Sequence, residues 1–182
     1  MATRPLPTAP PPLTDAGLLA ALRRGEADAL GAAYHRYAPE LLLLARRLLG
    51  NAAEAEDVVQ DLFVGLPEAL ARYEDRGQLA GWLRTLVARL ALMRLRSGRR
   101  RRESPLELAP PPAARHPEPT GALTLAALLA ALPEAQRLVV VLRAIEGYSH
   151  AEVAALLGIR RNAAEVRYHR ALARLRELQE EP

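Results

Sequence analysis

The chain has 182 residues, half of them hydrophobic, and a formal net charge of +4 at pH 7. This length is enough for one large or two small domains. It contains no cysteine, which excludes a disulfide framework and a cysteine metal site and is compatible with a cytoplasmic location. The N-terminal residues hold no apolar signal core and the longest apolar run is too short for a bilayer, so we expect no membrane insertion.

Two proline-rich segments divide the chain. Residues 1–14 are predicted to form a disordered tail and residues 103–122 a flexible linker. The other residues have helical periods and no strand-like alternation. The sequence therefore predicts an all-α fold of two small helical domains, over residues 15–102 and 123–179.

The charge differs between these parts of the chain. Residues 1–78 carry eight arginines and eleven acids, whereas residues 79–122 carry nine arginines and three acids. Phosphates attract cations, and a basic protein surface attracts carboxylates. The distribution therefore indicates two different partners.

The first domain is predicted to contain five helices, with glycines and prolines marking their ends. Their spans, in chain order, are 15–24, 26–38, 40–49, 53–66 and 79–96. Pro39 is expected to end the second helix, and Pro67 to end or kink the fourth. The start of the fourth helix is acidic, as the helix dipole favours, but the dipole explains poorly why Asp61 lies two turns in. A docking face for a basic partner is the functional interpretation.

Arginines are concentrated at the end of the fifth helix and directly after it. They are Arg94, Arg96, Arg99, Arg100, Arg101 and Arg102. A helix C-terminus favours cations in any case, but this density beside the Trp82-bearing helix favours contact with nucleic acid. The preceding polar loop, residues 73–78, is a candidate for contacting unstacked bases.

The second domain is predicted to begin with a helix over 123–132 and another that opens at Pro133 and closes at Gly147. Residues 147–176, GYSHAEVAALLGIRRNAAEVRYHRALARLR, then predict two helices joined by a tight turn at Gly158. Ser149 and Glu152 match a capping box, and Asn162 is expected to cap the last helix, with Glu165 three residues on.

The last helix is predicted to be amphipathic. One face carries Ala164, Tyr168, Ala171, Leu175 and Leu178, and the arginines at 167, 170 and 174 point elsewhere. This is the helix-turn-helix arrangement that places a recognition helix in the major groove. An ordinary helical hairpin with solvated arginines is the alternative.

Catalytic and metal-binding patterns are not found. The four histidines share no metal-ligand spacing, and no phosphate-cradling glycine loop is present. We expect no enzyme activity, catalytic residue, metal or cofactor.

The two blocks together resemble a bacterial RNA polymerase sigma factor of the extracytoplasmic-function (ECF) group of the sigma-70 family. YHRYAPELLLLARRLLGNAAEAEDVVQDLF and WLRTLVARLALMRLRSGRRRR are similar to region two, and LPEAQRLVVVLRAIEGYSHAEVAALLGI with VRYHRALARLRE to region four. The resemblance implies a factor that directs core polymerase, through its clamp helices and flap, to promoter DNA. It also implies an anti-sigma factor as a partner.

The resemblance also implies roles for individual residues. Contacts with core polymerase are expected from Asp57, Gln60, Asp61 and Phe63. Contacts with minus-ten DNA are expected from Asp75, Arg76, Gln78, Trp82, Arg84, Arg89, Arg94 and Arg96. Contacts with minus-thirty-five DNA are expected from Arg160, Arg161, Asn162, Ala163, Glu165, Val166, Arg167, His169 and Arg170.

Some positions depart from the family pattern. Arg89 stands where Asn is usual, Met93 where Asp is frequent, and Glu165 among positions that are usually small and polar or basic. Glu165 is either a capping residue or an acceptor for cytosine. These departures leave two rivals open: a sigma mimic that binds an anti-sigma protein without reading promoters, and a stand-alone helix-turn-helix regulator.

Overall fold

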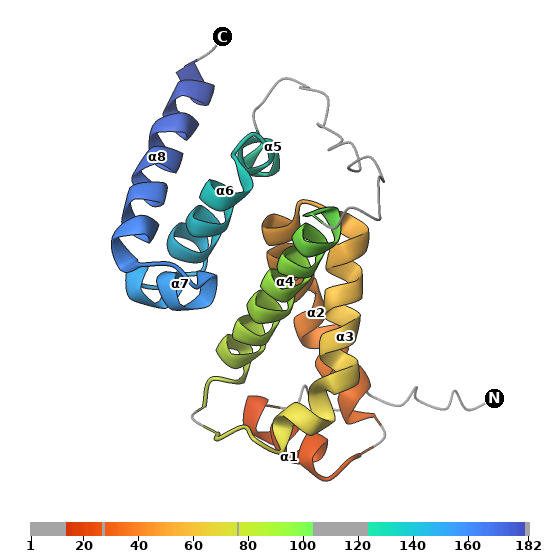
Figure 1. The fold of residues 1–182 in the computed structure, drawn as a ribbon. Helices are drawn as coiled ribbons and strands as arrows, with labels where there is room; N and C mark the ends of the chain where they lie inside the picture. Colours follow the sequence, from red (N-terminus) through yellow and green to blue (C-terminus); the bar gives the residue numbers. More distant parts are fainter. Residues whose placement is uncertain (1–13, 27, 76, 104–123, 181–182) are drawn as a thin grey trace, which may run out of the picture.

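The computed structural model describes residues 14–26, 28–75, 77–103 and 124–180, and every regular element in these ranges is a helix (Figure 1). The all-α prediction is confirmed. The predicted N-terminal tail, Arg76 and nearly all of the predicted linker lie outside the described residues.

The elements form two modules. The N-terminal module consists of α1 (Asp15–Arg23), α2 (Ala29–Leu49), α3 (Ala52–Leu70) and α4 (Leu79–Glu103). The C-terminal module consists of α5 (Leu125–Ala130), α6 (Glu134–Val140), the π-helical turn η1 (Val141–Ile145), α7 (His150–Leu157) and α8 (Arg161–Glu180). In Figure 1 the green helix α4 lies on the side of its module that faces α6 and α7.

The helix end predicted at Pro39 was wrong, and of the end or kink predicted at Pro67 the end is excluded. The helix α2 continues through Pro39 and joins two predicted helices, and α3 continues through Pro67. Proline removes one backbone donor and strains the preceding turn. Buried side chains lie on both sides of each proline, such as Tyr37 and Leu41 in α2. Continuous packing against the core therefore outweighs the loss of one hydrogen bond.

Local signals explain several of the other helix ends. Asn51 begins α3 because its side-chain oxygen accepts hydrogen bonds from the amides of Ala53 and Glu54, at 3.0 and 3.3 Å. Gly50, at φ +70°, ends α2 in the left-handed conformation that glycine adopts without steric cost.

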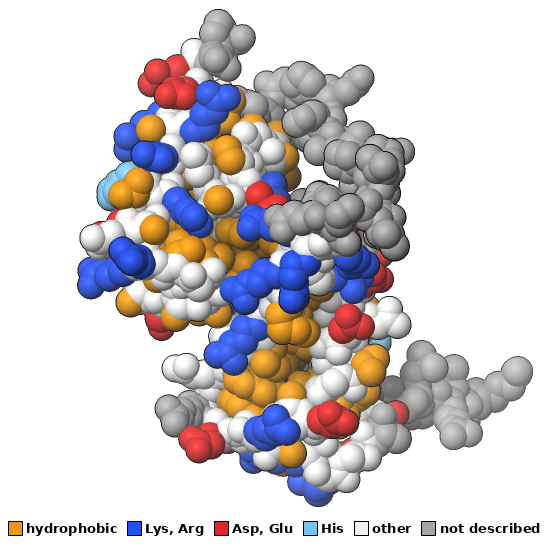
Figure 2. All heavy atoms as spheres, viewed as in Figure 1, with side chains coloured by type: hydrophobic (Ala, Val, Ile, Leu, Met, Phe, Trp, Pro, Cys, Tyr) orange, Lys and Arg blue, Asp and Glu red, His pale blue; other side chains and the backbone are white. Residues whose placement is uncertain are grey.

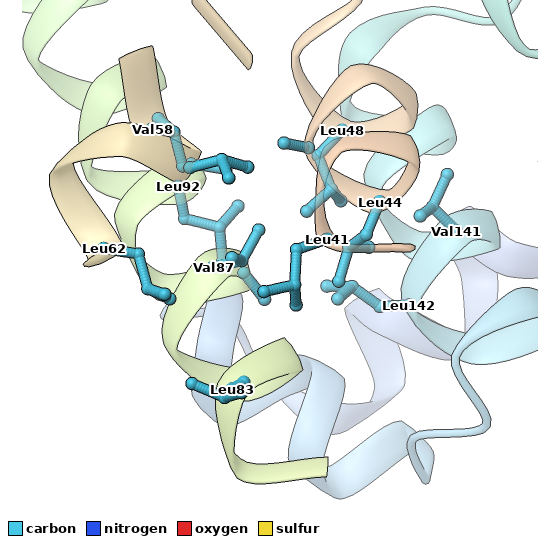
Figure 3. Close-up of a cluster of buried hydrophobic side chains, with 14 of the residues drawn as sticks. Leu41, Leu44, Leu48, Val58, Leu62, Leu83, Val87, Leu92, Val141 and Leu142 are labelled. Carbon is cyan, nitrogen blue, oxygen red and sulfur yellow. The ribbon is translucent and has the colours of Figure 1, made fainter. Parts of the chain in front are cut away.

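The two modules share one hydrophobic core. Leu41 and Leu44 of α2 pack on one side against α3 and α4 and on the other lie near Val141 and Leu142 of η1 (Figure 3). The side chains of Val141 and Leu142 are fully buried. The helix α2 is therefore the central element against which the C-terminal module is seated.

Candidate polymerase- and DNA-binding surfaces

The first candidate surface combines the loop before α4 with the start of that helix. The ring of Trp82 packs on that of Tyr73, with centroids 4.5 Å apart. A pocket of about 360 Å³ opens beside them, lined by Gln78 and Thr85 among others. Aromatic rings beside polar groups suit unstacked bases. The structure thus brings together Gln78 and Trp82, whereas Asp75 accepts a hydrogen bond from the Gly77 amide at 2.9 Å and shapes the loop.

Some of the arginines of α4 are held by acceptors within the protein. Arg94 forms an ion pair with Asp57 of α3, and Arg84 lies 3.6 Å from the carboxylate of Glu40. Arg89 is exposed. Arg94 therefore ties α4 to α3 in this structure, and Asp57, expected on the polymerase side, is its partner.

The C-terminal module also contacts the helix α4. Arg96 donates a hydrogen bond to the carbonyl oxygen of Leu156 in α7 at 2.8 Å, and Arg99 pairs with Glu134 of α6. The hydroxyl groups of Thr85 and Tyr148 lie 3.0 Å apart. Figure 2 shows basic side chains gathered where the C-terminal part of α4 meets the second module. Residues expected to contact minus-ten DNA are thus next to, or within, the contact between modules.

Partly buried charged groups accompany this contact. Burial raises the pKa of the Glu146 carboxyl above its usual range, although the nearby guanidinium groups of Arg84 and Arg47 act in the opposite direction. Burial also lowers the pKa of Arg137, whose guanidinium lies against the α2 end at Leu48 and Gly50. The modules therefore meet through desolvated polar groups as well as through the apolar core.

The second candidate surface lies on α2 and α3. Gln60 and Asp61 are exposed, whereas Phe63 is only 5 % exposed and packs edge-on against Tyr34, with ring centroids 5.0 Å apart. The next residue, Val64, is 75 % exposed. Sequence reasoning missed Val64 and Tyr34, although an apolar residue one position outside the buried stripe of a helix is a readable signal. Phe63 supports this surface from beneath.

The third candidate surface is the outer face of α8. Ser149 and Glu152 form the predicted capping box at the start of α7, with bonds of 3.2 and 2.7 Å, and Gly158 turns the chain at φ +67°. Hydrogen bonding to Ser149 lowers the pKa of Glu152. Ala164 and Ala171 are fully buried and anchor α8 to its module. The helix-turn-helix predicted from the sequence is formed.

The predicted cap at Asn162 was wrong. The helix α8 begins at Arg161, and the carbonyl of Arg160 accepts hydrogen bonds from the amides of Ala163 and Ala164 at 3.0 and 3.2 Å. Asn162 is therefore the second residue of the helix and lies inside it, past the capping position. The side chains left exposed at this end and along this face are Arg160, Arg161, Asn162, Val166, His169 and Arg170, while Ala163, Glu165 and Arg167 are half-buried.

A further groove of about 600 Å³ lies between the modules. It is lined by the half-exposed apolar side chains of Leu43 and Leu125 and by the guanidinium groups of Arg46, Arg47 and Arg137. Arg46 also pairs with Glu56 at 2.9 Å. The apolar and basic lining of this groove suits an apolar segment that carries acidic groups.

The described part of the chain holds no group of three or more His, Cys, Asp or Glu residues that could bind a metal ion. No helix among the described residues is long and apolar enough to cross a membrane.

Known proteins with similar sequences are sigma factors. The ECF RNA polymerase sigma factor SigM of Mycobacterium tuberculosis is 32% identical over 165 residues, covering 91% of this chain and 84% of the relative. The RNA polymerase sigma factor CarQ of Myxococcus xanthus is 34% identical over 160 residues, covering 86% and 92%.

Solved structures give the same result. The sigma factor RpoE in complex with the anti-sigma factor NepR from Bartonella quintana matches with a TM-score of 0.60 and 26% identity, covering 86% of this chain and 100% of that one. CnrH in complex with the cytosolic domain of CnrY matches with a TM-score of 0.54 and 34% identity, covering 90% and 95%.

The Sigma-70 region 2 family model matches residues 33–101, and the Sigma-70 region 4 model matches residues 122–175. The chain belongs to the ECF sigma factors of the sigma-70 family.

Proposed function

We propose separate roles for the two modules of this sigma factor. The factor directs core RNA polymerase to specific promoters and initiates transcription. Residues 15–102 dock on core polymerase and hold the opened minus-ten element, and residues 123–179 read the minus-thirty-five element. The order of the two matched regions on one chain carries this proposal. The factor supplies no chemistry of its own and acts in the cytoplasm, with polymerase performing the synthesis.

We assign polymerase docking to the surface formed by Gln60, Asp61 and Val64. It combines an acid, an amide and an exposed apolar side chain on one helix, which is suited to a basic helical partner such as the clamp helices. Phe63 and Tyr34 hold this surface in place from below.

Charge reversal at Asp61 tests the docking surface. Asp61→Arg is expected to weaken binding to core polymerase at least tenfold, because two like charges then face each other, as measured by competition with a labelled sigma factor. The matched control is Glu180→Arg, the same reversal on the exposed end of α8. Equal affinity of both variants and the unaltered protein would remove Asp61 from the docking surface.

The minus-ten role requires the two modules to separate. Arg96 and Thr85 contact the C-terminal module in this structure, so single-stranded DNA cannot take those positions at the same time. We infer that binding to polymerase favours the separated form, since a partner shifts the equilibrium toward the form that it binds better.

We also propose an anti-sigma partner for the groove between the modules. The structurally similar sigma factor RpoE was solved in complex with the anti-sigma factor NepR, and CnrH was solved in complex with the cytosolic domain of CnrY. The groove of Leu43, Leu125 and three arginines suits an acidic amphipathic helix of that partner. A partner that contacts both modules would keep them in contact with each other, as they are in this structure; we call this the closed arrangement.

Run-off transcription is the decisive experiment. Core polymerase from a GC-rich bacterium is expected to produce new transcripts from a genomic promoter library when this protein is added. Tight binding to core or to an anti-sigma protein without any transcripts would indicate the sigma mimic. Promoter binding without polymerase, by a dimer, would indicate the stand-alone regulator.

A further inference from the structure

The outer face of α8 carries an acid where DNA would come closest. Glu165 accepts a hydrogen bond from the Nε of Arg161 at 2.9 Å, and the two side chains are 34 % and 70 % exposed. Phosphates repel carboxylates, so an acid on a DNA-reading helix weakens binding unless it gains a contact in return. Glu165 therefore needs a specific explanation.

Helix capping does not supply that explanation. The helix begins at Arg161, and the carboxylate of Glu165 accepts from the Arg161 side chain in place of a backbone amide. A capping box at this end would need the carboxylate to accept from the backbone of the capping residue, as Glu152 does at Ser149.

Stabilisation of α8 does not explain the presence of Glu165 either. The pair places the cation at the positive end of the helix dipole and the acid one turn further in, which is the weaker of the two orientations. An exposed pair of this spacing contributes about 0.3–0.5 kcal/mol at best. The arrangement is therefore poorly suited to stabilising α8.

Base readout fits both side chains. Among base edges in the major groove, a carboxylate gains a hydrogen bond from the N4 amino group of cytosine, and guanidinium groups bind O6 and N7 of guanine. Arg161 neutralises Glu165 through its Nε and keeps two further nitrogens as donors. The pair fixes the carboxylate in one orientation before DNA arrives.

We propose that Glu165, positioned by Arg161, selects a cytosine in the minus-thirty-five element by accepting a hydrogen bond from its N4 amino group. Arg161 reads a guanine next to that position. This inference rests on the proposed reading of the minus-thirty-five element by α8.

The test uses holoenzyme made from core polymerase and the full chain. A promoter library keeps one minus-ten sequence and randomises the minus-thirty-five element, and transcripts are sequenced. The unaltered protein is expected to enrich cytosine at one position, with guanine beside it. Glu165→Gln should lower that cytosine preference by roughly five- to 150-fold and favour adenine there, because glutamine pairs with N6 and N7 of adenine.

Two further variants sharpen the result. Arg161→Ala should lose the preference for guanine and weaken the preference for cytosine, because it removes the group that positions Glu165. The matched control Glu177→Gln, in the second arginine–glutamate pair of α8, should leave every preference unchanged. All variants change exposed or half-exposed side chains, and circular dichroism verifies that they remain folded.

The outcomes separate this inference from the proposed function. Transcripts whose base preferences are the same for Glu165→Gln and the unaltered protein would overturn the inference and leave the sigma factor function standing. Complete absence of promoter-dependent transcripts from the unaltered protein would overturn the proposed function, and the inference with it.

Discussion

Tyr37 joins α2 to α1 through its hydroxyl group, which donates to the Asp15 carboxylate at 2.9 Å. Burial and this bond raise its pKa from 10.0 to about 12. The folded protein thus favours the protonated phenol, so the stabilisation is complete below pH 10 and is lost as the pH rises toward 12. In urea unfolding, Tyr37→Phe should lower the free energy of unfolding by about 1 kcal/mol at pH 7 and should flatten its decline above pH 10.

The control for this residue is Tyr34→Phe. Tyr34 lies on the same helix but is 48 % exposed, so its loss should leave the alkaline decline in place. An unchanged decline in the Tyr37→Phe protein would assign the alkaline sensitivity to another group.

At the scale of elements, glycine-to-alanine substitutions in the turn between α7 and α8 and in the first turn of α2 are predicted to have opposite effects on stability. Gly158 has φ +67°, whereas Gly31 lies within α2 and has open space where alanine would add its methyl group. Gly158→Ala should therefore destabilise the protein by about 1 kcal/mol, since a side chain disfavours the left-handed region. Gly31→Ala should stabilise it by about 0.5 kcal/mol, because alanine is the better helix former and Gly31 lies in the first turn. Thermal unfolding of both variants checks the signs, and two shifts in the same direction would contradict the assigned backbone conformations.

At the scale of the whole molecule, the closed arrangement predicts that fixing the modules together stops initiation. The chain has no cysteine, so Thr85→Cys with Tyr148→Cys introduces a unique pair for a short bis-maleimide cross-linker. Cross-linked protein should lose run-off transcription, because α4 then stays covered by the C-terminal module. Each single-cysteine variant treated with the same reagent should keep it. Equal transcription from the cross-linked protein would show that closure and initiation are compatible.

The sequence predicted those features that depend on neighbouring residues. The capping box at Ser149 and the turn at Gly158 were readable because their partners lie within a few positions. The helix end expected at Pro39 was wrong, and α3 does not end at Pro67, because distant packing outweighs a local preference.

Contacts between distant residues could not be predicted in this way. The bond between Thr85 and Tyr148 links residues 63 positions apart, and Arg96 meets a backbone carbonyl 60 positions away. Neither pairing leaves a periodic signal in the sequence. Most residues of the candidate surfaces could be proposed from the sequence, whereas the contacts of α4 with the second module could not.

The protein acceptors of the α4 arginines have a consequence for the response of promoter binding to ionic strength. Arg94 and Arg99 are paired with Asp57 and Glu134, and DNA phosphates that take over these arginines leave two carboxylates without partners. Cations displaced from the DNA are then partly recaptured by those carboxylates, so net counter-ion release is smaller than the number of phosphate contacts. Under the proposed minus-ten role, promoter affinity is therefore expected to fall less steeply with salt concentration than the number of phosphate contacts alone would give.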